Sequence, residues 1–305
     1  MTAAHLKVIA LGVLVLALVW GGTALLPSGT DRRAADFRLP ALVRDSVDAI
    51  VVAAPGETVT VARAAAGGWT VNGFAASGTA VEELFAAIRD TVQPELVARS
   101  ATSFARLGVD SGAARRLTVT GGGRTVLDLL VSERGTDAGG AYVRERADSS
   151  VYAWPGNLAS VVRRRVDDWR NRVIGAVTPD SIRRVEVERG ARRYSLVRRD
   201  SVWAFSTGAS ADSAAVARLL DRFRTLSAGG FPNAAQLDSA FRGRRERRVA
   251  LFGPADTALL TLDFDSTAGG FWVRRSGGGT VYRVGTWEAD QLTPADSTLK
   301  RRAGG

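Results

Sequence analysis

The chain has 305 residues, 46% of them hydrophobic and 24% charged, which is typical of a folded protein with room for about two domains. Its net charge of +10 comes from 41 basic residues, nearly all of them Arg, spread among 31 acids, so the charge alone does not predict nucleic-acid binding. The absence of Cys excludes disulfides, thiolate metal sites, a cysteine nucleophile and a lipid-modified Cys, and the single His, His5, disfavours a His-dependent active site.

An apolar stretch near the N-terminus, residues 6–26, predicts a transmembrane helix. Lys7 is its one ionisable side chain, and a helix of this length spans roughly 31 Å, about the thickness of a hydrocarbon core. We therefore expect a membrane anchor over residues 1–28 that holds the protein in the inner membrane, with most of the chain outside the cytoplasm. The alternative is a cleaved signal peptide, for which residues 22–24 (GTA) offer a weak cleavage site.

The chain beyond the anchor repeats itself. After a linker over residues 29–46, we predict a first unit at 47–165 and a second unit at 182–292, separated by a connector at 166–181 and followed by a flexible tail at 293–305. Segments of the two units match in the same order, 130 to 135 residues apart: 47–52 with 182–187, 68–71 with 202–205, 116–119 with 248–251, 126–131 with 258–263, 141–144 with 271–274, and 151–154 with 281–284.

Each unit also contains one stretch with apolar residues at the spacing i, i+3, i+4, i+7, which predicts a helix with one buried face. These residues are Val81, Leu84, Phe85 and Ile88 in the first unit and Val216, Leu219, Leu220 and Phe223 in the second. Thr79 with Glu82, and Asp212 or Ser210, are the expected caps. The alternating segments predict antiparallel strands. The predicted fold class is therefore α+β, a transmembrane helix followed by two tandem sheet modules with one amphipathic helix each.

The second unit carries most of the excess positive charge. Residues 182–292 contain 18 Arg against 12 acids, whereas residues 47–165 contain 13 Arg against 12 acids. This asymmetry predicts contact with a partner or an anionic surface. The candidates form one cluster: Arg242, Arg244, Arg245, Arg247 and Arg248. The simpler interpretation is that these side chains are solvated or paired with acids on neighbouring strands.

Two motifs resemble functional sites but lack residues that such sites need. Residues 263–267 (DFDST) begin like a calcium loop, yet the Gly and Glu required later in that loop are missing, so a half-buried strand is expected. Residues 297–300 (STLK) have the spacing of a serine–lysine nucleophile but fall in the expected flexible tail. Trp69 and Trp203, placed alike in the two units, are expected in the core. We predict no catalytic residue, no metal and no cofactor.

Three short segments resemble the DUF4340 family of bacterial envelope proteins: residues 104–110 (FARLGVD), 142–144 (YVR) with 151–152 (VY), and 168–172 (DWRNR). With the anchor and the Trp-centred hairpin, the resemblance extends over about residues 6–290, and the second unit departs from the family pattern at residues 241–244 (FRGR). Members of that family are often encoded beside gliding-motility-type ABC transporter components. The resemblance therefore implies an accessory envelope role, and it brings no established catalytic residues.

The sequence as a whole favours a non-enzymatic, single-pass envelope protein that binds a protein partner as an accessory component of an ABC-type transport or envelope complex. Two alternatives stay open at this point. One is an envelope hydrolase that uses acidic or Ser residues not yet identified. The other is a binder of anionic cell-wall polymer through the Arg-rich second unit. No nucleic-acid partner is expected, and the sequence identifies neither a small-molecule ligand nor an oligomeric state.

Overall fold

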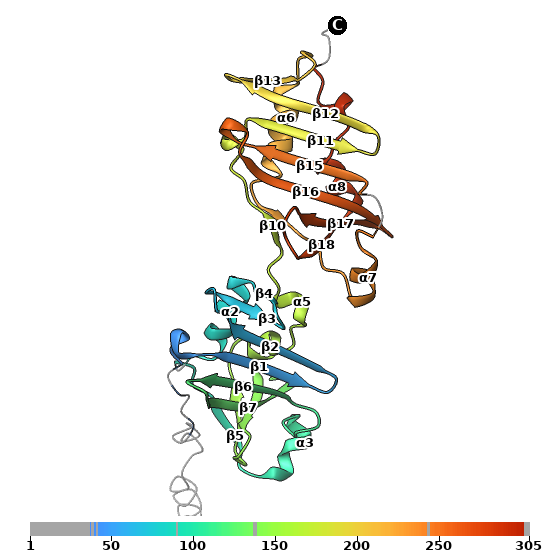
Figure 1. Cartoon of the computed structure of the whole chain (residues 1–305). Coiled ribbons are helices and arrows are strands. Elements are labelled where there is room, and N and C mark those ends of the chain that lie inside the picture. The colour runs from blue at the N-terminus through green and yellow to red at the C-terminus, as the bar shows by residue number, and fades with distance from the viewer. Residues whose placement is uncertain are drawn as a thin grey trace, which may run out of the picture. The chain divides into compact units, whose positions relative to one another are not determined.

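The computed structural model describes residues 37, 40, 42–89, 91–136, 139–242 and 245–301 (Figure 1). The chain divides after Arg170 into two compact units, and this boundary falls inside the connector expected at residues 166–181. The expected anchor at residues 1–28 and most of the linker at 29–46 lie outside the described residues. Across the ranges that are described, no helix combines the length and the hydropathy needed to cross a bilayer.

A nine-stranded antiparallel sheet forms the first unit, in the order β4-β3-β2-β1-β6-β7-β8-β9-β5. Its strands are β1 (Ala49–Ala54), β2 (Glu57–Arg63), β3 (Trp69–Val71), β4 (Phe74–Ala75), β5 (Glu95–Ala98), β6 (Arg115–Gly121), β7 (Arg124–Gly135), β8 (Ala141–Glu145) and β9 (Val151–Trp154). The β6–β7 hairpin turns through Gly122 and Gly123, whose φ angles of 58° and 72° favour glycine and suit the tight turn.

A seven-stranded antiparallel sheet forms the second unit, in the order β13-β12-β11-β15-β16-β17-β18. Its strands are β11 (Arg184–Arg189), β12 (Arg192–Arg199), β13 (Val202–Phe205), β15 (Arg247–Phe252), β16 (Ala258–Thr267), β17 (Gly270–Arg275) and β18 (Val281–Val284). A separate two-stranded ribbon pairs β10 (Val173–Gly175) with β14 (Leu226–Ser227).

The two sheets share one strand order. The series β3-β2-β1-β6-β7-β8-β9 corresponds to β13-β12-β11-β15-β16-β17-β18, and the segments matched in the sequence fall on these strands. The likeness includes the 3-10 helices before the first strand of each unit, η1 (Arg44–Ser46) and η3 (Pro179–Ser181). In both, the final Ser hydroxyl donates to the carbonyl three residues back. A mainly antiparallel α+β architecture is confirmed.

Each unit contains more helices than the one expected. In the first unit they are α2 (Gly78–Ala87), α3 (Phe104–Leu107), α4 (Leu158–Val162) and α5 (Val166–Trp169). In the second unit they are α6 (Ser213–Asp221), α7 (Ala234–Ser239) and α8 (Thr286–Leu292). Most of the additional helices are shorter than two turns, so their sequences cannot show a helical period. The sequence also predicts a helix over residues 157–165, and α4 lies within this range.

The caps of the two longer helices differ in how well the sequence predicted them. Asp212 caps α6 as expected, accepting a hydrogen bond from the Ala215 amide at 2.9 Å. In α2 the predicted capping by Thr79 is wrong, because Ser77 is the cap and accepts from the Ala80 amide at 3.4 Å. Several hydroxyl residues near one helix start compete for this role, and the chain direction entering the helix decides between them.

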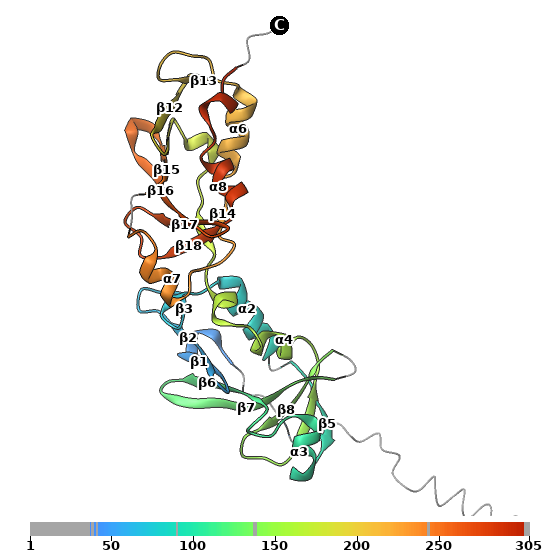
Figure 2. The same ribbon diagram turned by 90° about the vertical axis from the view of Figure 1, so that its right-hand side faces the viewer.

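The helices α2 and α4 lie on one side of the first sheet, and α6 and α8 lie on one side of the second (Figure 2). The predicted apolar faces point into these layers: Val81 and Leu84 of α2 are fully buried, and Val216 of α6 is too. Trp69 and Trp203 are 8% and 6% exposed, which confirms the prediction that both belong to the core.

Part of the opposite sheet face carries a second small layer. In the first unit, the guanidinium of Arg144 on β8 is buried over the ring of Phe104 at 4.1 Å and donates to the Val109 carbonyl at 2.9 Å. In the second unit, Arg274 on β17 lies over Phe241 at the same distance. Two segments that carry the family resemblance, residues 104–110 and the YVR segment, are thus held together by this Arg.

Candidate functional site

The predicted Arg cluster lies at the start of β15 and in the loop before it. Three of its members make ion pairs within the second unit: Arg245 with Glu188 (2.6 Å), Arg247 with Asp290 (2.7 Å) and Arg248 with Asp263 (3.7 Å). Arg242 is exposed, and Arg244 lies outside the described residues. The pairing with acids that the sequence offered as the simpler interpretation therefore describes three of the five residues.

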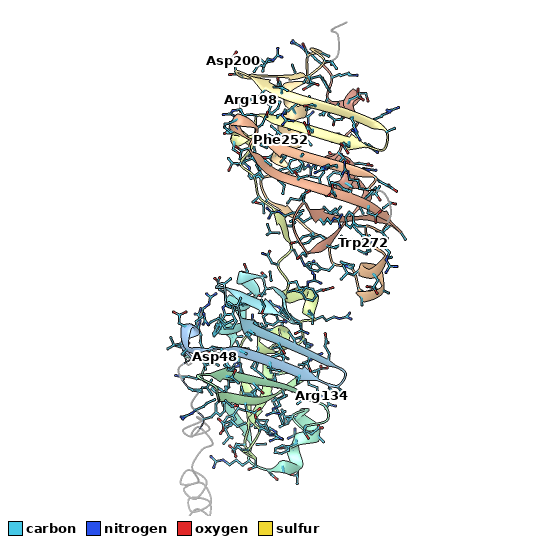
Figure 3. All side chains as sticks on the ribbon, in the orientation of Figure 1. Asp48, Arg134, Arg198, Asp200, Phe252 and Trp272 are labelled. Carbon is cyan, nitrogen blue, oxygen red and sulfur yellow. The ribbon has the colours of Figure 1, made fainter. Side chains whose placement is uncertain are left out.

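The pairs of Arg245 and Arg248 belong to a row of alternating charges on the sheet face opposite α6, whereas Arg247 is on the other face, where it meets Asp290 of α8. The residues directly opposite one another across five strands are Arg193, Glu188, Arg248, Asp263 and Arg274. The Arg245 guanidinium adds to the row, and its hydrogen bond holds the pKa of the Glu188 carboxyl below the ordinary value. Phe252 of β15 lies on the same face (Figure 3), and the Arg184 guanidinium lies 3.8 Å from the centre of its ring. Several Arg side chains of the second unit are thus paired with acids on the sheet itself.

The motifs that resembled functional sites have structural roles. Asp263 and Asp265 lie on β16, so the calcium-like segment is a strand, as expected. The tail expected to be flexible is instead packed as far as residue 301. It forms the 3-10 helix η5 (Asp296–Thr298), buries Leu299, and pairs Lys300 with Asp296 at 2.6 Å. Among the described residues, no group of three or more His, Asp and Glu side chains is placed to hold a metal ion.

A groove of about 800 Å³ opens between α6 and α8 in the second unit. One wall comes from α6, the other from α8, and the packed tail closes one side through Pro294, Ala295 and Leu299. Arg218 and Arg222 of α6 line it together with Glu288 and Gln291 of α8. No sequence pattern indicated this site, which depends on residues about 75 positions apart.

The corresponding place in the first unit is filled by α4. This helix buries Leu158, Ala159, Val161 and Val162 and packs against both α2 and β7. Counted from the preceding strand, α8 has Ala289 and Leu292 at two of these positions, and both are buried. The other two positions hold Glu288 and Gln291, which line the groove. Two polar residues in place of Leu158 and Val161 therefore leave the space between the helices open.

The segments that follow α4 and α8 run alike. Trp169 accepts a hydrogen bond through its carbonyl from Ser77 at 2.7 Å, and Leu299 accepts one from Asp212 at 2.8 Å. Each bond joins the segment to the residue that caps the helix, α2 or α6. The fully buried Trp169 is thus replaced in the second unit by the smaller Leu299, which widens the groove further.

The charged groups of the groove differ in whether they are already paired. Asp221 pairs with Arg224 at 3.0 Å, and Asp290 pairs with Arg189 at 2.9 Å as well as with Arg247. Within the described residues, Arg218, Arg222 and Glu288 make no ion pair. The groove therefore keeps two guanidinium groups on the α6 wall and one carboxylate on the α8 wall for other contacts.

An exposed tryptophan stands beside the groove. Trp287 of α8 is 61% exposed, and the Arg222 guanidinium lies 4.8 Å from its ring centre. Exposed aromatic residues next to Arg are enriched at sites of protein contact. The groove could have been found in the sequence by aligning the two units beyond residue 284, where apolar residues of the first unit correspond to polar residues of the second.

A second cavity of about 940 Å³ adjoins the groove and shares Arg189, Pro294 and Ala295 with it. Tyr194 lies in its wall, and the hydroxyl donates to the Pro294 carbonyl at 2.8 Å. Burial raises the pKa of Tyr194 well above its ordinary value, so the hydroxyl stays protonated and keeps this bond. The bond fixes the tail against β12, and the tail wall of the groove is therefore held in place.

The family comparison agrees with the segments noted in the sequence. The profile of DUF4340, described as a domain of unknown function, matches residues 69–241, which is more than half of the chain. The chain belongs to the DUF4340 family. The match runs from β3 of the first unit to the residue before the Arg cluster in the second, so both units contribute to it. No curated protein and no solved structure matches the chain.

Proposed function

We propose that this DUF4340 protein is a non-enzymatic accessory component of an ABC-type transport or envelope complex, and that it binds a protein partner through the groove between α6 and α8. The observation that carries the proposal is the contrast between the units. The first unit fills the space between α2 and α4, while the second leaves about 800 Å³ open between α6 and α8. Arg and Glu side chains that form no ion pair with any described residue line this space, and an exposed Trp lies beside it.

A binding role follows from how this groove is built. Its walls stand on a sheet of seven strands and are fixed by buried residues such as Leu219 and Leu292, so little order is lost when a partner binds. Exposed polar residues at helix positions that could instead hold core residues have a cost in stability. A contact with another molecule is a physical reason for keeping them.

The apolar N-terminal stretch completes the proposal. Residues 6–26 form the transmembrane helix of a single-pass anchor in the inner membrane, with the two units outside the cytoplasm. Confinement to the membrane raises the local concentration of the groove around a membrane partner, so a modest intrinsic affinity is sufficient. An anionic cell-wall polymer is the less favoured ligand, because Arg245, Arg247 and Arg248 are already paired with acids.

Site-specific photo-crosslinking in intact membranes tests this proposal. A photoreactive residue replaces Thr225, which is exposed and lines the groove, in the full-length chain. The matched control carries it at Ser160, an exposed residue of α4 in the first unit. We expect an adduct with a subunit of a membrane transport or envelope complex from the Thr225 variant alone.

The same experiment is repeated with the groove closed by Glu288→Leu and Gln291→Val, the changes that give α8 the apolar residue types of α4. The adduct is expected to disappear while the protein stays folded. Equal adducts from Thr225 and Ser160, or an adduct unaffected by closing the groove, would contradict the proposal.

A further inference from the structure

We infer that the groove recognises a protein segment that sets a carboxylate against Arg218 and aliphatic side chains between α6 and α8. This inference rests on the proposed function and adds the chemistry of the partner. It comes from a reversal of charge between the two units at one equivalent pair of positions.

The first unit supplies the template. Glu83 of α2 is paired there with Arg164, which lies between α4 and α5, and the Arg164 guanidinium also donates to the Ala80 carbonyl. This ion pair joins α2 to the segment after α4. The guanidinium of Arg164 lies 5.4 Å from the ring centre of Trp169 as well, so one side chain ties three elements together.

In the second unit, the position equivalent to the acid of this ion pair carries the opposite charge, and the position equivalent to its Arg carries no charge. Counted from the helix caps, the position of Glu83 is occupied by Arg218. Counted from the preceding strands β9 and β18, the position of Arg164 is occupied by Pro294. Pro294 lines the groove but carries no charge. Arg218 therefore lines the space that corresponds to the internal ion pair of the first unit, and it makes no ion pair with any residue that the structure describes.

The neighbouring acids are engaged elsewhere. The Asp212 carboxylate caps α6, and its hydrogen bond from the Ala215 amide is the largest cause that lowers the pKa of Asp212; the charge of Arg218 contributes as well, but the two side chains make no ion pair. Asp221 pairs with Arg224, and Glu288 on the facing wall makes no ion pair with Arg218. A guanidinium presents a planar set of donors that fits a carboxylate with two parallel hydrogen bonds, so a Glu or Asp of the partner is the complementary group.

The rest of the groove indicates aliphatic neighbours for that carboxylate. Leu219, Leu226 and Leu299 form its floor, and the space corresponds to side-chain volume that Leu158, Val161 and Trp169 occupy in the first unit. A free anion such as phosphate would satisfy Arg218 but would leave most of the groove, about 800 Å³, unfilled. A protein segment with an acidic residue among branched aliphatic residues satisfies both.

Peptide selection on the intact protein tests the inference. A library of random 12-residue peptides displayed on phage is selected on the full-length chain in lipid nanodiscs, and again on Arg218→Glu. Arg199→Glu is the matched control, because Arg199 is also exposed but lies at the end of β12, outside the groove lining. Peptides that still bind the closed-groove variant Glu288→Leu, Gln291→Val are removed.

We expect Asp or Glu beside Leu, Ile or Val in the peptides selected on the wild type and on Arg199→Glu, and Lys or Arg in those selected on Arg218→Glu. For one synthetic wild-type peptide, changing the acid to its amide should weaken binding about tenfold, and 10 mM inorganic phosphate should not displace it. The inference would be overturned, with the proposed function left standing, by peptides that need the open groove but are not enriched in Asp or Glu. Peptides with the same residues selected on the wild type and on Arg218→Glu would have the same consequence. If no selected peptide depends on the open groove, the proposed function fails as well.

Discussion

The two units use one sheet topology and differ in the layer that covers it. In the first unit α4 buries four of its five residues, and Trp169 fills the space beside α2. In the second unit α8 buries only Ala289 and Leu292 of its seven residues, and Leu299 stands where Trp169 does. A few changed side chains in a short helix and the segment after it are therefore enough to convert a packed layer into an open groove, because the sheet beneath stays the same.

The largest predicted difference in stability between the two units concerns the Arg that lies on the sheet face away from the long helices. Arg144 is 8% exposed and donates to four backbone carbonyls, whereas its counterpart Arg274 is partly exposed. Arg144→Ala leaves those carbonyls without their donor and should lower the free energy of unfolding by about 3 kcal/mol. Arg274→Ala should lower it by less than about 1 kcal/mol. Urea unfolding of both variants measures the difference, and equal losses would contradict the assigned roles.

A second substitution makes the first unit resemble the second. Trp169→Leu removes part of a fully buried side chain and should lower the free energy of unfolding by about 2–3 kcal/mol, through lost burial and the cavity left behind. Hydrogen exchange of α2 should rise in this variant, and exchange of α6 should not change. Unchanged exchange of α2 would show that Trp169 does not hold the layer together.

The reverse change makes the second unit resemble the first. Glu288→Leu with Gln291→Val adds apolar surface beside Leu219 and should raise the free energy of unfolding by about 1–2 kcal/mol. The measurement is thermal unfolding of the variant beside wild type, with Ser160→Leu as a control for an added apolar residue on an exposed helix position. A loss of stability would mean that the two polar residues hold α8 in place rather than keep a groove open.

The smallest effect concerns pH. The pKa of Glu188 is lowered in the folded protein by its bond to Arg245, so the stabilisation is fully present above the ordinary value of 4.5 and is lost as the pH falls below it. Because both side chains are partly exposed, the contribution is under about 1 kcal/mol. Arg245→Gln should flatten the fall in stability below pH 4.5, as measured by urea unfolding at several pH values. An unchanged pH profile would contradict this pairing.

Local patterns predicted most of the sheet architecture. The alternation in residues 47–52 and 182–187, and the helical spacing from Val81 and from Val216, describe one face of one element, which a sequence window contains in full. The short helices α5 and α8 were not predicted, since stretches of four to seven residues hold too little of a helical period. The tail was expected to be flexible because it lies near the end of the chain, yet Leu299 is buried against the core.

Unlike the sheet architecture, the contacts of the candidate site could not be predicted from local sequence patterns. The Arg cluster was visible as a run of charge, but a sequence does not show that Arg245, Arg247 and Arg248 meet Glu188, Asp290 and Asp263. Those pairings depend on strand register and on the position of α8. The groove could not be predicted from either wall alone, since each wall has the sequence pattern of an ordinary helix with polar residues on one side.

The amino-acid sequence by itself determined the apolar N-terminal stretch, the duplicated order of strands and the faces that are buried, because periodicity and composition are properties of neighbouring residues. Only the tertiary structure decided that Arg218, Glu288 and the segment around Pro294 face one open space. The physical reason is that a groove is the space left between several segments that are distant in the sequence, so no single segment predicts it.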